Sequence, residues 1–110
     1  MHITIEDILF QNGQLFKYNL RVKKGDITII IAGESLITIP VCNQFINAIE
    51  DGRKISAKLN TSSVTKSYIK YDKKLYIYGH DCVIKLDSDK AINFFKSIIQ
   101  LLNNPIPADA

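Results

Sequence analysis

The sequence predicts an α+β protein built from antiparallel β-sheet and two amphipathic helices. Three observations support this prediction. Apolar and polar residues alternate with a period of two over most of the chain, which is typical of strands with one buried face. The period then changes to that of a helix over residues 40–51, and again over residues 87–102. We therefore expect sheet whose apolar face is covered by helices.

The composition limits the class of protein. The chain has 110 residues, the length of one domain, with 46% hydrophobic and 23% charged residues. No apolar run approaches the ~20 residues that span a bilayer, and the first residues lack the basic and apolar regions of a signal peptide. We expect a cytoplasmic protein without a membrane partner. It would have a single domain over residues 1–104 and a flexible tail over residues 105–110.

The first half contains strand patterns separated by turns. Residues 3–10 form the first pattern, and Asn12-Gly13 predicts a tight hairpin turn because both residues accept positive φ. Residues 15–22 alternate most cleanly. Residues 27–31 are all β-branched, which favours a strand. A short fourth strand is expected at residues 36–39. The apolar side of the second pattern would comprise Phe16, Tyr18, Leu20 and Val22.

The first helix is predicted from Pro40 to Asp51. Proline suits the first turn of a helix, where its missing N–H costs nothing. Gly52 can close the helix in a left-handed conformation. The apolar stripe would comprise Val41, Cys42, Phe45, Ile46 and Ile49.

The second half repeats this plan. Strands are expected at residues 54–60, 64–71, 75–78 and 82–86, followed by a helix whose N-cap is Asp87. The halves therefore read as a ββββα-ββββα pseudo-repeat, over residues 1–52 and 53–104. The alternative is a pleckstrin-homology-like barrel of seven strands with a C-terminal helix, in which residues 40–51 would be a helical insertion.

The segments before the two helices carry a resemblance to a known fold. Residues 33–39 and 79–86 each contain a glycine, a tight turn and a short strand pattern. Four strands followed by a helix, twice in one chain, resembles the whirly-type fold that transcriptional-coactivator and purine-rich-element-binding repeats share. The resemblance covers the order of elements. It implies that single-stranded nucleic acid would bind on the strands of the sheet.

Charge is distributed unevenly between the halves. Residues 1–52 hold four Lys and Arg against six Asp and Glu, whereas residues 53–110 hold ten against five. The basic second half suggests an anionic partner.

The expected outward positions of the second-half strands combine lysine with tyrosine. Aromatic rings stack on bases at ~1–3 kcal/mol each, and lysines neutralise phosphates. The same pattern suits a solvated sheet face held by cross-strand pairs, or a protein interface, where tyrosine is enriched. The candidate residues for binding nucleic acid or another partner are Lys58, Lys66, Tyr68, Lys70, Tyr76, Tyr78 and Lys85.

The sequence carries no catalytic or metal-binding motif of the kinds GxxxxGK[ST], HExxH, CxxC or GxSxG. His80, Asp81 and Cys82 are consecutive, and strand neighbours point to opposite faces, so they cannot converge as a nucleophilic triad does. Cys42 lies on an apolar stripe and is expected in the core. We expect a non-enzymatic protein without a metal or cofactor.

The final helix has an apolar stripe that Phe94 and Leu101 make unusually broad. Either the helix is deeply buried, or these two residues form a homodimer interface.

Three functional hypotheses follow. The first is binding of single-stranded nucleic acid. The second is a protein-binding accessory or inhibitor module, of the kind that phages and mobile elements encode against a host protein. The third is a homodimeric structural subunit.

Overall fold

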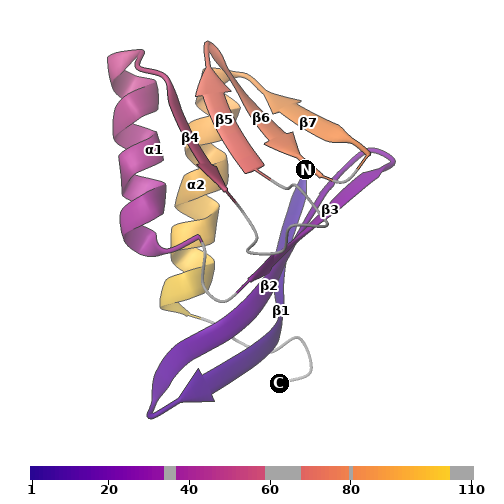
Figure 1. Ribbon diagram of the computed structural model, residues 1–110, viewed down its shortest axis with the longest axis vertical. Helices are drawn as coiled ribbons and strands as arrows, with labels where there is room; N and C mark the ends of the chain where they lie inside the picture. Colours follow the sequence, from indigo (N-terminus) through magenta and orange to yellow (C-terminus); the bar gives the residue numbers. More distant parts are fainter. Residues whose placement is uncertain (34–36, 59–67, 80, 105–110) are drawn as a thin grey trace.

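The computed structural model describes residues 1–33, 37–58, 68–79 and 81–104. The strands form two antiparallel sheets, one in the order β1-β2-β3 and one in the order β4-β5-β6-β7 (Figure 1). The predicted α+β class with two helices is confirmed. In chain order the elements are β1 (His2–Gln11), β2 (Gln14–Lys24), β3 (Ile27–Gly33), α1 (Ile39–Asp51), β4 (Ile55–Lys58), β5 (Tyr68–Asp72), β6 (Lys74–Tyr78), β7 (Val83–Leu86) and α2 (Ser88–Asn103).

The first sheet is a long hairpin with β3 added to it. Asn12 and Gly13 have φ of 53° and 77°, so the tight turn predicted from this pair is confirmed. On the face toward the helices, Ile5, Leu20 and Ile31 stand side by side in register and are buried. The turn of the hairpin extends beyond the helices (Figure 1).

Two register shifts in the hairpin change which side chains are buried. One shift falls between Glu6 and Leu9, and the next falls between Leu9 and Phe10. Leu9 and Phe10 pair with Lys17 and Leu15, so Phe16 falls in a bulge between them. A bulge reverses the facing of the strand beyond it. The expectation that Phe16 shares the buried face of β2 is therefore wrong, and its side chain is 44% exposed.

The second sheet is a meander of four short strands. Ile69, Tyr71, Leu75, Ile77 and Ile84 are buried along its inner face, and their neighbours in sequence point the other way. This alternation is the period of two that a sheet with one buried face requires.

The helices have the ends that their sequences favour. In α1 the Thr38 hydroxyl accepts a hydrogen bond from the Val41 N–H at 3.3 Å, and Gly52 closes the helix at φ 69°. In α2 the N-cap is Asp87, as predicted, although its side chain makes no capping hydrogen bond. Neither helix of the described residues is long and apolar enough to cross a membrane.

Both helices and both sheets meet in one cluster of buried residues. The helices lie side by side (Figure 1), and the ring of Phe95 connects them. Its centroid is 4.9 Å from that of Phe45 in a stacked arrangement, and 5.1 Å from that of Phe94 in an edge-on arrangement. Helix α2 also contacts β1, β6 and β7. It therefore packs against both sheets.

The expected strand at residues 36–39 is wrong in its described part. Thr38 is the N-cap of α1 and Ile39 is its first residue, because a capping hydroxyl and the following Pro40 together favour the start of a helix. The described first half thus has three strands before its helix, and only the second half has the order ββββα.

Other predicted features lie outside the described residues or stay untested. The expected strand residues 59–60 and 64–67 and the tail at residues 105–110 are not described. The barrel alternative stays a prediction. The described residues form seven strands, and the last described element is a helix, but the strand pairs link strands only within each sheet.

Candidate binding surface

The outer face of the second sheet gathers the predicted lysines and tyrosines in two rows. One row runs across the strands as Lys58, Tyr68, Tyr78 and Val83, and the next row runs as Ser56, Lys70, Tyr76 and Lys85. The buried side chains of the same strands point to the opposite face. We call these eight residues the Lys/Tyr face.

Three tyrosines of the Lys/Tyr face form a ladder. The rings of Tyr68 and Tyr78 stack across the strands, with centroids 4.3 Å apart and planes 19° apart. Tyr76 and Tyr78 are 6.1 Å apart, with planes 20° apart. Stacked rings cover each other's facing sides. A ligand can therefore reach the ring edges, the hydroxyl groups and the outer sides of Tyr68 and Tyr76.

Lysines flank this ladder. Tyr76 stands in register between Lys70 and Lys85, and Lys58 stands opposite Tyr68. Lys58 and Lys85 are exposed, and Lys70 is half-buried. None of the eight residues of the face is acidic, so the three ammonium groups give it a local positive potential.

The charges beside the Lys/Tyr face are paired. The Lys54 ammonium lies 3.8 Å from an Asp72 carboxylate oxygen, and the Lys74 ammonium lies 3.7 Å from one of Asp87. These exposed pairs contribute little to stability. Among the described residues, Lys58, Lys70 and Lys85 form no such ion pair.

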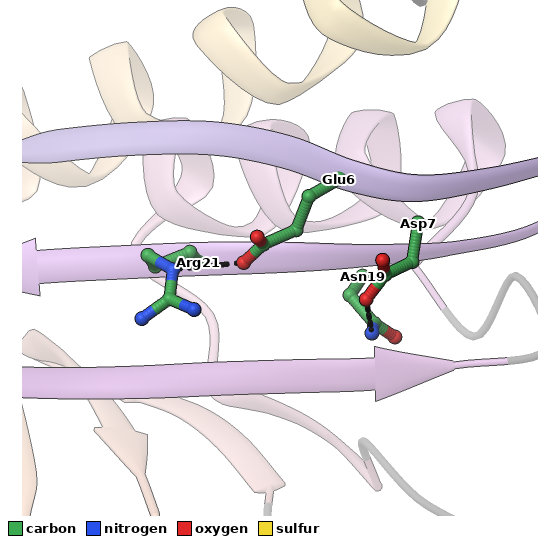
Figure 2. Close-up of polar contacts among 4 residues, drawn as sticks. All are labelled: Glu6, Asp7, Asn19 and Arg21. Atoms are coloured by element: carbon green, nitrogen blue, oxygen red, sulfur yellow. Dashed lines mark hydrogen bonds and ion pairs between the residues drawn. The ribbon is translucent and has the colours of Figure 1, made fainter. Parts of the chain in front are cut away.

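The outer face of the first sheet carries carboxylates, unlike the Lys/Tyr face. The Arg21 guanidinium donates to Glu6 at 2.8 Å, and the Asn19 amide donates to Asp7 at 2.9 Å. Figure 2 shows these four side chains along β1 and β2, with the helices behind the sheet. Here each carboxylate has a hydrogen-bonding partner on the neighbouring strand. This strip is therefore a weaker candidate for an anion than the Lys/Tyr face.

One predicted site residue is not described, and another is buried in the core. Lys66 lies outside the described residues. Phe94 is only 1% exposed because it packs inside the core beside Phe95, so it offers no surface to a second subunit. Leu101 is half-buried against the same core. Of the two residues of the dimer hypothesis, only Leu101 retains exposed surface.

The end of the β1–β2 hairpin exposes three large apolar side chains, which the sequence patterns did not reveal. Leu9, Phe10 and Phe16 are 51%, 49% and 44% exposed. The Lys17 ammonium lies 5.7 Å from the ring centroid of Phe16, within the range of a cation–π interaction. The hairpin signal at Asn12-Gly13 could have placed these residues at a turn. It could not have shown that the turn extends beyond the helices.

Cys42 is a core residue in the structure. It is fully buried on α1, and burial raises the pKa of its thiol to about 12. The neighbouring Tyr18 is also buried, and its hydroxyl donates to the Ile37 carbonyl. Among the described residues no cluster of three or more His, Cys, Asp or Glu could hold a metal ion.

We expect thiol reagents to distinguish the two cysteines. At pH 8 the thiol of Cys42 stays protonated and shielded, whereas Cys82 is only half-buried. The native protein should therefore be alkylated at Cys82 first, and at Cys42 only after unfolding, as mass spectrometry of the peptides would show. Rapid labelling of a native Cys82→Ser variant would contradict this placement.

Comparison with models of protein families, with curated proteins and with solved structures found no match to this chain. The functional proposal below rests on the geometry of the Lys/Tyr face.

Proposed function

We propose that this protein binds single-stranded nucleic acid on the Lys/Tyr face. The observation that carries the proposal is the register that sets Tyr76 between Lys70 and Lys85, beside the stacked Tyr78 and Tyr68. Proteins that bind single strands combine a positive track for the backbone with aromatic rings for the bases. Both components lie on one accessible sheet face in this chain.

The arrangement suggests how a strand would lie. Lys70 and Lys85 are two strand spacings apart, about 10 Å, with Tyr76 between them. Phosphates would contact the ammonium groups, and a base would stack on the outer side of the Tyr76 ring. A further base would reach the outer side of Tyr68, next to Lys58. The phosphate contacts carry no sequence information, so weak sequence preference is expected.

The preference for a single strand follows from the ring contacts. The bases of a duplex are stacked on one another and offer no free face, so a duplex would gain only the phosphate contacts. We expect labelled oligo(dT) or oligo(rU) to bind more tightly than a duplex of equal length.

Replacement of Tyr76 by alanine tests the proposal. Loss of a base–aromatic stack of ~1–3 kcal/mol should weaken binding of oligo(dT) by about 5- to 150-fold, as measured by fluorescence anisotropy at low salt. Tyr76→Phe keeps the ring and should retain most of the affinity. Phe16→Ala removes an exposed ring from the other sheet and serves as the matched control.

Two results would overturn the proposal. One is the absence of binding by the unmodified protein to any single strand at low salt. The other is equal affinity of the Tyr76→Ala and Phe16→Ala variants, with circular dichroism showing both to be folded.

A protein-binding module is the second candidate function, and the hairpin end favours it. Leu9, Phe10 and Phe16 are exposed apolar side chains near the end of one hairpin, and a partner that covered them together would gain apolar contact area. Under this proposal the chain is an accessory or inhibitor module that acts on a host protein. Capture of a stoichiometric protein partner at ~0.5 M salt, where long-range charge effects are screened, and its loss in a Phe10→Ser variant would support it over nucleic-acid binding.

A further inference from the structure

A hollow of about 380 Å³ lies where the start of β1, the end of β2, the end of β7 and helix α2 meet. Ile3, Leu86 and Phe94 supply apolar surface to it. Leu86 and Phe94 are almost completely buried, at 2% and 1% exposure, so they form its innermost part. Leu86 points to the inner side of the sheet, whereas Lys85 belongs to the Lys/Tyr face. The hollow is therefore separate from the surface proposed to bind nucleic acid.

Positive charge and neutral hydrogen-bonding groups surround this apolar part. Lys24 and Lys90 line the hollow, and none of its described lining residues is acidic. The Lys24 ammonium donates to the Lys85 carbonyl at 2.8 Å, which holds its position at the rim. Lys90, Asn93 and Ser97 succeed one another on one side of α2, at spacings of three and four residues. Two lysines, an amide and a hydroxyl thus adjoin a buried apolar surface.

We propose that this hollow binds a small carboxylate with an aliphatic chain. The chain would lie against Ile3, Leu86 and Phe94, and the carboxylate would lie between Lys24 and Lys90. Asn93 and Ser97 would donate hydrogen bonds to the same group. The volume falls in the range of ~300–1,000 Å³ that is typical of small-molecule sites, and an apolar lining with a few convergent polar groups is their usual composition. A cationic ligand is disfavoured by the two lysines.

A charge series of probes with one chain length tests the chemistry of the site. Titrations with octanoate, octanol and octylamine would be followed by the amide resonances of Leu86, Asn93 and Ser97 in two-dimensional NMR spectra. We expect saturable shifts with octanoate, affinity lower by about fivefold or more with octanol, and the weakest binding with octylamine. Acetate, which has the charge without the chain, should bind more weakly than octanoate. Equal binding of the three probes, or no saturable shift with octanoate, would overturn the proposal.

Substitutions at exposed positions test the location. Lys90→Gln should weaken octanoate binding by about fivefold and leave octanol binding unchanged. Lys96→Gln removes a charge from the same helix outside the hollow and should change neither. Ser97→Phe places a large side chain at the hollow and should abolish binding of both probes. Octanoate affinity that is unchanged in both Lys90→Gln and Ser97→Phe would overturn the assignment. Both readouts are independent of nucleic-acid binding.

Discussion

Replacement of Phe95 by alanine is expected to lower the free energy of unfolding by about 3–5 kcal/mol. The Phe95 side chain is completely buried, stacks on Phe45 of α1 and meets Phe94 edge-on. Its removal leaves a cavity where the two helices pack, and the remaining side chains can close such a cavity only in part. Urea denaturation followed by circular dichroism would measure the change.

Phe16→Ala is the matched control for this prediction. It deletes the same ring at a position that is 44% exposed, and the lost cation–π interaction with Lys17 is worth about 0.5–1 kcal/mol at an exposed site. We expect a loss of about 1 kcal/mol or less. Similar losses in the two variants would mean that Phe95 does not hold the helices together as described.

Simultaneous replacement of Lys58, Lys70 and Lys85 by glutamine is expected to reduce the salt dependence of oligonucleotide binding. Each phosphate contact on a single strand contributes about −0.7 to the slope of log K against log salt, so three lost contacts should reduce the slope by about 2. By the same relation, affinity at ~0.1 M salt should fall by about 100-fold. Anisotropy titrations with oligo(dT) over a series of salt concentrations would measure both quantities.

A second triple variant controls for net charge. Lys23, Lys90 and Lys96 are exposed on β2 and α2, away from the Lys/Tyr face. Their replacement by glutamine removes the same charge and should leave most of the slope intact. Equal reductions in the two triple variants would show that the whole positive field, and not this face, attracts the oligonucleotide.

Much of the fold could be predicted from the sequence because its signals are local. The Asn12-Gly13 turn, Pro40 in the first turn of α1, and Gly52 at its end act within a few residues of chain. The facing of β5 and β6 was also predictable. A strand with one buried face must alternate, so burial of Ile69 and Ile77 places Lys70 and Tyr76 on the opposite side. The residue content of the Lys/Tyr face follows from this local rule.

The closeness of the side chains on that face was not predictable from alternation. The stacking of Tyr68 on Tyr78, and the position of Tyr76 between two lysines, depend on the register between strands. Register is a property of pairs of segments. A shift of two residues would keep every tyrosine on the outer face and would separate the rings.

The α+β class, both helices and the side of the second sheet on which lysine and tyrosine lie follow from local patterns in the sequence. Three other features arise from packing between distant segments: the exposure of Phe16, the burial of Phe94 and the hollow beside Lys24 and Lys90. Phe16 is exposed because the register shift between Leu9 and Phe10 leaves it in a bulge of β2. Phe94 is buried because α2 packs on α1 and on both sheets at once, so its broad apolar stripe is covered within one chain. Both outcomes depend on contacts between segments far apart in sequence, which no local pattern encodes.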